Sequence, residues 1–191
     1  LNKLTTGIKL NPKFLNEILK NYTALLKRVD THIQQVGKDY PDEIVCKKGC
    51  DSCCQFLNLF PVEAFALASA FLQTEKSSQD SVRAELKKPT TACPLLIDHQ
   101  CRLYQARPII CRTHGYPLYL KKKGETLVDF CPENFKGMTS FPRSSLLDLE
   151  QLNTLLTAIN TQFVTSLEIK PFADRIPMSR ALLLLEKMED V

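Results

Sequence analysis

The sequence lacks the marks of several protein classes. Six glycines and eleven prolines in 191 residues are too few for a collagen-like or low-complexity chain. There is no apolar run long enough to cross a bilayer, and the mean hydropathy is −0.14, which excludes a membrane-spanning helix. No glycine-rich motif is present, so a phosphate-binding loop is excluded too. We therefore expect a soluble globular protein with a sizeable core.

The N-terminal residues also lack the pattern of a secretory signal. Lys3 and Lys9 occur there, but no continuous apolar stretch leads to a small-residue cleavage site. We therefore expect a cytoplasmic protein. The sequence starts at Leu1 without Met, so a leader removed beforehand is left open.

Apolar residues recur at helical spacing near both ends of the chain. The expected helices cover 11–40, with Asn11 and Pro12 as N-cap and first turn, about 61–86 with a polar break at 74–80, about 144–167, and 178–188. Shorter runs predict hairpins within 95–104 and 118–130. With no internal repeat or linker, the pattern predicts a mainly α fold with small β-hairpins. We expect a single compact helical domain over 1–191, with an irregular cysteine-rich, metal-binding middle at about 46–132.

Eight cysteines are the unusual feature of the composition, and four of them lie within nine positions, from Cys46 to Cys54. Cys50 and Cys53 are the strongest pair, because a Cys-x2-Cys step presents two thiolates to one ion, and Gly49 supplies backbone freedom for the turn. The side chains of adjacent Cys53 and Cys54 point apart in extended backbone. This predicts either two neighbouring metal centres or one polynuclear cluster.

The other four cysteines are spaced too widely for one metal-binding turn, so the fold must bring separate loops together. Four plus four thiolates would complete two tetrahedral zinc sites. Cysteine followed by proline, at Cys93 and Cys131, also occurs in iron–sulfur proteins, so the metal is zinc or iron, with an iron–sulfur cluster possible. A disulfide framework or free buried thiols are the alternatives. The predicted metal ligands are Cys46, Cys50, Cys53, Cys54, Cys93, Cys101, Cys111 and Cys131.

Several other side chains are candidates for the site. Arg107 and Arg112 flank Cys111 and are predicted to bind the cofactor by neutralising thiolate charge, or alternatively to bind an anion. His114 follows Cys111 at a ligand-like spacing, but eight thiolates already suffice for two sites. Glu63 is either an oxygen ligand or a first-turn acid of its helix, and we favour the second reading. Tyr104 is expected in the core.

The cysteine segments together resemble a known family. The resemblance rests on Cys46, Gly49, Cys50, Cys53 and Cys54, on Cys93-Pro94-Leu95-Leu96, on Cys101-x2-Tyr104-x2-Arg107-Pro108-x2-Cys111-Arg112, and on Cys131. This pattern is similar to the CxxCxxCC cysteine-cluster family of zinc- or iron-chelating proteins and covers roughly residues 46–132. The first gap here holds three residues, as in one branch of the family. The resemblance implies metal binding and little about activity.

The sequence therefore predicts a cytoplasmic, cysteine-rich protein that binds zinc or iron. Two alternatives stay open, an iron-dependent redox or modifying enzyme with an open metal position, and a metal-trafficking or interaction module. The net charge of +4 counts thiols as neutral, so it is no argument for nucleic acid. The lysines at 121–123 are interpreted as a solvated hairpin tip. The expected partners are a metal ion and an unidentified protein, without nucleic acid or membrane.

Overall fold

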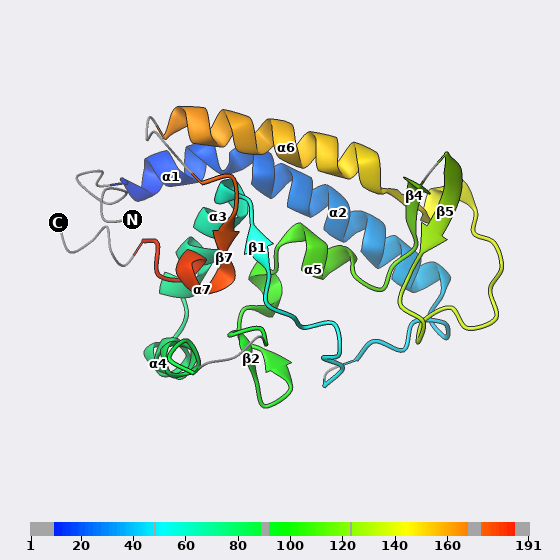
Figure 1. Ribbon diagram of the computed structural model, residues 1–191, viewed down its shortest axis with the longest axis horizontal. Helices are drawn as coiled ribbons and strands as arrows, with labels where there is room; N and C mark the ends of the chain where they lie inside the picture. The colour runs from blue at the N-terminus through cyan, green and yellow to red at the C-terminus, as the bar shows by residue number, and fades with distance from the viewer. Residues whose placement is uncertain (1–9, 48, 89–91, 123, 168–172, 186–191) are drawn as a thin grey trace.

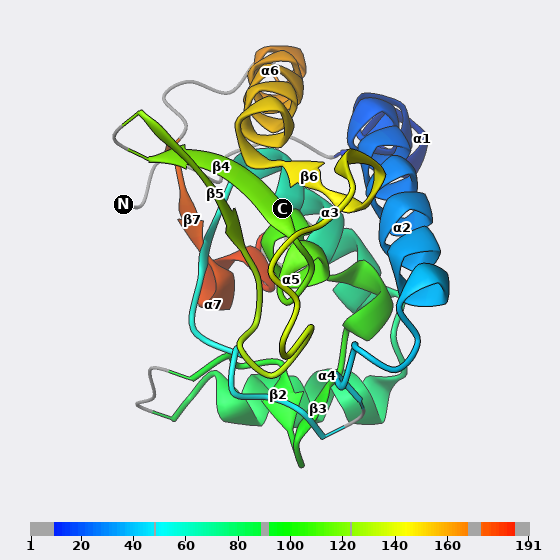
Figure 2. The same cartoon turned by 90° about the vertical axis from the view of Figure 1, so that its right-hand side faces the viewer.

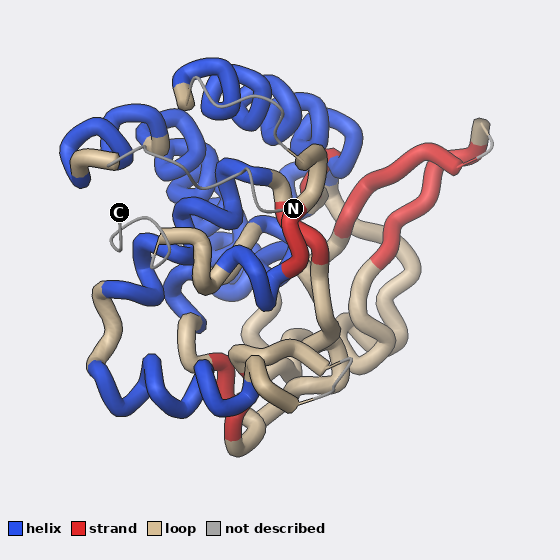
Figure 3. The backbone as a smooth tube through the Cα atoms, turned by 60° about the vertical axis from the view of Figure 1, so that its left-hand side comes forward, coloured by secondary structure: helices blue, strands red, loops and turns tan. Residues whose placement is uncertain are grey.

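The computed structural model describes residues 10–47, 49–88, 92–122, 124–167 and 173–185 (Figure 1). Helices form one part of the molecule and most of the irregular loops gather on the other side (Figure 3). The prediction of a mainly α fold with small hairpins is confirmed. Within the described residues, no helix combines the length and apolarity needed to cross a membrane. The single domain over 1–191 stays a prediction.

The first predicted helix is two helices, α1 (Pro12–Ile18) and α2 (Lys20–Asp39), separated at Leu19. Asn11 is the N-cap, and its Oδ1 accepts a hydrogen bond of 2.8 Å from the backbone N–H of Lys13. α2 buries one stripe of side chains at helical spacing against α6 (Leu149–Ser166), which lies alongside it (Figure 1). The stripe consists of Tyr22, Leu25, Val29, Ile33 and Val36.

α3 (Pro61–Leu72) is apolar on all sides because it separates two clusters of buried side chains. Phe65 belongs to the first cluster and packs on Phe163 of α6, with ring centroids 5.3 Å apart. Phe71 belongs to the second cluster, with Val82 of α4 (Lys76–Glu85). The helix predicted over 61–86 is therefore broken, at the polar stretch where a break was expected.

The strands form small sheets. β2 (Leu96–Ile97) pairs with β3 (Gln100–Cys101), and β4 (Leu118–Lys122) pairs with β5 (Glu125–Asp129), so both predicted hairpins are present. Two pairings were not predicted, β1 (Asn58–Leu59) with β7 (Ile176–Pro177), and β6 (Leu147–Asp148) parallel to β4. Short helical turns connect these pieces: η1 (Tyr104–Ala106), α5 (Ile109–Thr113) and η2 (Arg143–Ser145).

The last two predicted helices are shorter than expected. The helix predicted from 144 starts at Leu149, because the residues before it pair as β6, and Asp148 Oδ1 caps it by accepting from the Gln151 N–H at 3.0 Å. The C-terminal helix α7 is limited to Met178–Ala181 among the described residues, and positions 186–188 lie outside them.

Candidate metal centre

The first cysteine segment folds as consecutive tight turns. Gly49 has φ +94°, a conformation in which a side chain is strained, and the N–H of Cys50 donates to the Lys47 carbonyl at 2.9 Å. The N–H of Cys54 then donates to the Asp51 carbonyl at 2.8 Å. Cys50 and Cys53 are thus carried on two adjoining turns rather than on the one tight turn that the Cys-x2-Cys spacing predicts.

Strand pairing brings the second segment to the first. Gln55 forms an antiparallel bridge with Ala92, and this register sets Cys54 opposite Cys93. Cys101 lies in β3, where it pairs with Leu96 of β2, and Leu96 follows Cys93 by three residues. Leu95 anchors this hairpin in the core, because it is only 2% exposed. Figure 2 shows the loop after α2 running beside β2 and β3.

Cys111 completes a group of four. It lies in α5, and its thiol interacts electrostatically with those of Cys93, Cys101 and Cys54. All four side chains are partly buried. We call Cys54, Cys93, Cys101 and Cys111 the inner group.

The remaining cysteines gather around Asn134. The Asn134 carboxamide is within hydrogen-bond distance of Cys46 Sγ, and the Asn134 backbone N–H donates to the Cys131 carbonyl at 2.9 Å. Cys50 hydrogen-bonds to the thiol of Cys46 and interacts electrostatically with Cys53 and Cys131. We call Cys46, Cys50, Cys53 and Cys131 the outer group.

Burial and mutual repulsion disfavour thiolates in the inner group. Burial raises the pKa of Cys54 to about 12, with the thiols of Cys53, Cys93 and Cys101 adding to it. Burial also raises the pKa of Cys111 to about 12, with neighbouring thiols again contributing. A cation among these sulfurs would reverse this effect, because it attracts the ionised form.

The donor chemistry fits zinc or iron, since both accept four thiolates. All eight cysteines are free thiols, so the disulfide framework is not what the structure contains. In the part of the chain that the structure describes, however, no three Cys, His, Asp or Glu side chains already converge as a metal site. The two groups are therefore sets of neighbouring sulfurs that an ion would have to draw together.

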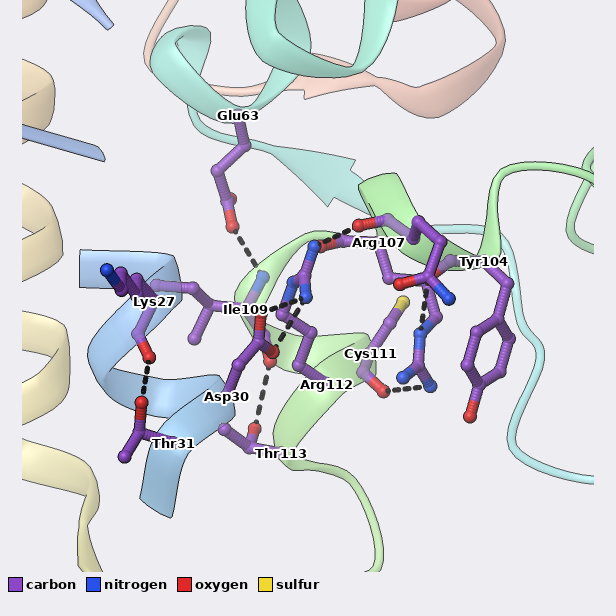
Figure 4. A network of polar contacts seen from close by, with 11 residues as sticks. Lys27, Asp30, Thr31, Glu63, Tyr104, Arg107, Ile109, Cys111, Arg112 and Thr113 are labelled. Carbon is purple, nitrogen blue, oxygen red and sulfur yellow. Dashed lines mark hydrogen bonds and ion pairs between the residues drawn. The ribbon is translucent and has the colours of Figure 1, made fainter. Parts of the chain in front are cut away.

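Arg107 lies beside the inner group. Its guanidinium stacks on the Tyr104 ring at 3.7 Å from the centroid and donates to the carbonyl oxygens of Tyr104 and Cys111 at 3.0 and 3.2 Å (Figure 4). Its charge lowers the pKa of Cys101 and Cys111 against the larger effect of burial. Tyr104 is 56% exposed, so the prediction of a core position was wrong, and its ring packs on the Arg107 guanidinium instead.

Arg112 points the other way, into the helical core (Figure 4). Its Nη1 contacts both carboxylate oxygens of Asp30 in α2 at 2.7 Å, and its Nε donates to the Arg107 carbonyl at 2.6 Å. Nη2 donates to the carbonyl of Gln105. These contacts fix the loop before α5 on α2. The cofactor-binding roles assigned to Arg107 and Arg112 stay predictions, and these contacts give only Arg107 an electrostatic link to thiols.

The Glu63 carboxylate accepts hydrogen bonds from two backbone N–H groups. Its Oε2 accepts from the Phe60 N–H at 3.2 Å within its own first helical turn, and its Oε1 accepts from the Ile109 N–H at 3.1 Å, at the start of α5. Burial raises its pKa, while the two N–H donors act in the opposite direction. Glu63 therefore caps two helices, α3 and α5, and the first-turn reading agrees with these contacts.

The histidines lie at the edge of the site. His114 is exposed. His99 Nδ1 lies 2.7 Å from Asp51 Oδ2, and this polar contact joins the tip of the β2–β3 hairpin to the turn between Cys50 and Cys53. His99 and its neighbour Asp98 have φ of +57° and +52°, as a two-residue turn requires.

Sequence reasoning missed Asn134, Gly115 and Asp30. Asn134 follows Cys131 by three residues, a turn spacing that could have drawn attention to it. Gly115 lies against the outer group, where an added Cβ would be 3.0 Å from Asn134 Nδ2 and 3.6 Å from Cys46 Sγ. Asp30 is far from the cysteines in sequence, and nothing in its helical context marks it as the partner of Arg112.

The comparison with protein families agrees with this geometry. Residues 45–132 match the family model CxxCxxCC, described as a putative zinc- or iron-chelating domain. No curated protein and no solved structure matches the chain. The matched range contains every cysteine of the inner and outer groups. Over residues 45–132 the chain is therefore similar to the CxxCxxCC family.

Proposed function

We propose that the protein binds two zinc or iron ions, one through the inner group and one through the outer group. The observation that carries the proposal is that the Cys111 thiol interacts with those of Cys54, Cys93 and Cys101, whereas the Cys50 thiol interacts with those of Cys46, Cys53 and Cys131. This division explains the adjacent Cys53 and Cys54, because one belongs to each set. Four thiolates are the complete ligand set of a structural zinc site.

The surrounding residues would serve these sites in different ways. Arg107 offsets thiolate charge in the inner group, and Asn134 offers an N–H to Cys46 in the outer group. When bound, the ions supply positive charge that keeps the thiols ionised and ties distant loops together. Closed four-thiolate sets leave no open position for substrate, so the proposed role is structural or metal-carrying rather than catalytic. A reducing compartment such as the cytoplasm belongs to this proposal, because the thiols must stay unpaired.

An iron–sulfur cluster is the second candidate. The thiols of Cys53 and Cys54 are hydrogen-bonded to one another, so the two groups adjoin at this dipeptide. A polynuclear cluster could use both residues, each on a different iron.

Metal and sulfide analysis of protein purified without oxygen, together with its visible spectrum, distinguishes the candidates. The proposal predicts two metal ions per chain and no sulfide, and a colourless protein if the metal is zinc. A brown protein that contains sulfide would instead support the iron–sulfur cluster and contradict the two-ion proposal. Cys93→Ser and Cys131→Ser should each remove one of the two ions, whereas His114→Ala is the matched control and should keep both. Two ions retained in both cysteine variants would contradict the ligand assignment.

A further inference from the structure

The inner and outer groups differ in how they are attached to the core. Cys93 and Cys101 pack against the second core cluster, and Cys93 Sγ lies 3.5 Å from Sδ of Met178, which is 1% exposed. Cys111 is held on α5, whose first turn is capped by buried Glu63. Three of the four inner cysteines, all except Cys54, are therefore carried on elements that are packed or capped by buried residues.

The outer group is built from surface turns. Cys46, Cys50 and Cys53 are exposed, and the described residues of the segment that carries them, 46–47 and 49–53, form turns and no helix or strand. Its attachments include Asn134, whose buried carboxamide contacts Cys46 and whose N–H closes the turn after Cys131, and the contact of exposed His99 with Asp51 between Cys50 and Cys53. Solvent and other ligands can therefore reach three of the four sulfurs without movement of the core.

We propose that the outer group is an exchangeable site for a thiophilic ion such as Zn²⁺, whereas the inner group retains its ion as part of the fold. This inference rests on the proposed function and adds to it a different role for each of the two groups. The acceptor class follows from the exposed sulfurs, because a ligand with several thiolates or nitrogens can attack the ion one donor at a time. The ion leaves with its charge, and the thiolates left behind take up protons from water.

Because the two groups differ in how firmly they are attached to the core, the proposal predicts two different rates of Zn²⁺ release. Protein loaded with two Zn²⁺ is mixed with excess of a colour-forming zinc chelator, and release is followed by absorbance. One Zn²⁺ per chain should leave at least about tenfold faster than the other, because local opening of surface turns is easier than opening of packed elements. The folded state, followed by circular dichroism, should persist through the fast phase and be lost or loosened in the slow phase. Equal rates, or unfolding in the fast phase, would overturn the inference.

Variants assign the two phases. Cys46→Ser and Cys50→Ser change exposed residues and should remove the fast phase alone, with one slowly released Zn²⁺ remaining. Cys101→Ser is the matched inner change and should remove the slow phase. If it fails to fold, that outcome also supports a structural inner site, provided that the outer variants stay folded. Loss of the slow phase in Cys50→Ser would overturn the inference. A wild-type chain that does not hold two Zn²⁺ would instead refute the proposed function, before any rate is compared.

Discussion

The carboxamide of Asn134 lies between Cys46 and Gly115, with Nδ2 3.4 Å from the sulfur of Cys46 and 3.0 Å from the carbonyl oxygen of Gly115. Its Oδ1 accepts from the Val45 N–H at 3.1 Å. Asn134 is 1% exposed, so water does not replace these contacts. One buried amide thus joins the cysteine loop to the segment after α5 and aims a donor at a predicted metal ligand.

Asn134→Ala should therefore weaken both the fold and the outer site. The Gly115 carbonyl would lose its partner in a buried contact, at about 1–3 kcal/mol in urea unfolding, and the Val45 N–H would lose its acceptor as well. Zinc affinity of the outer group should fall by about 10–100-fold, as for other residues that orient a ligand. Asn160→Ala is the matched control, because Asn160 Oδ1 accepts from the Val62 N–H at 3.1 Å in the helical core. It should lower stability but leave outer-site affinity unchanged, and an equal loss of affinity would count against Asn134 as a positioning residue.

Gly115→Ala should disturb the same site by crowding. Gly115 has φ +91°, and the new Cβ would lie 3.0 Å from Asn134 Nδ2 and 3.6 Å from Cys131 Cβ. Gly137→Ala separates crowding from backbone strain, since Gly137 has φ +83° with nothing within 4 Å. Both changes should cost about 1–3 kcal/mol through the left-handed backbone. Only Gly115→Ala should also lower zinc affinity, measured by chelator competition, and the same affinity loss in Gly137→Ala would show that strain alone is responsible.

Substitutions of Arg107 and Arg112 should have different effects, although both residues flank Cys111. Arg107→Gln removes the charge that lowers the pKa of Cys101 and Cys111, so the pH at which half of the inner group is loaded should rise. Arg112→Gln breaks the contacts of this buried side chain with Asp30 and with the carbonyl oxygens of Gln105 and Arg107 before α5, and should cost about 2–4 kcal/mol of unfolding free energy. A shift in the loading pH with Arg112→Gln and none with Arg107→Gln would reverse these assignments.

Some of this organisation could be predicted from the sequence because it is local. Gly49 and the Cys-x2-Cys spacing specify a turn, and the cap at Asn11 and both central hairpins follow from short-range patterns. Contacts between distant segments could not be predicted in this way. The Gln55–Ala92 bridge that sets Cys54 opposite Cys93 depends on how the second core cluster packs, and Asn134 reaches Cys46 across 88 residues. Arg112 showed the same limit, because its partner Asp30 lies on another helix.

Glu63 should make stability depend on pH in the direction opposite to an ordinary ion-paired acid. Burial raises the folded-state pKa of Glu63, so the protonated form is favoured by folding. This contribution is fully present below the unfolded-state pKa, about 4.5, and is lost as pH rises through the folded-state value. Glu63→Gln cannot titrate, so the unfolding free energy of this variant minus that of the wild type should increase with pH over that window. Glu150→Gln makes the same substitution at an exposed position in the first turn of α6 and is the matched control.

Metal uptake by the inner group should be coupled to proton release. Because burial and neighbouring thiols raise the pKa of Cys54 and of Cys111 to about 12, both are protonated at neutral pH and must lose their protons to bind an ion. Burial likewise raises the pKa of Cys93 and of Cys101. The logarithm of the inner-site affinity should therefore rise with pH, by up to about four per pH unit when all four thiols start protonated.

Calorimetric titration of zinc in buffers of different ionisation enthalpy counts these protons directly. Cys50→Ser isolates the inner site, since it changes an exposed outer cysteine. About four protons should leave as its remaining Zn²⁺ binds, and adding Cys54→Ser, which replaces an inner ligand, should abolish this binding together with its proton release. Release of fewer than two protons in the Cys50→Ser protein would mean that the inner sulfurs are already thiolates, and burial would then not be what controls their ionisation.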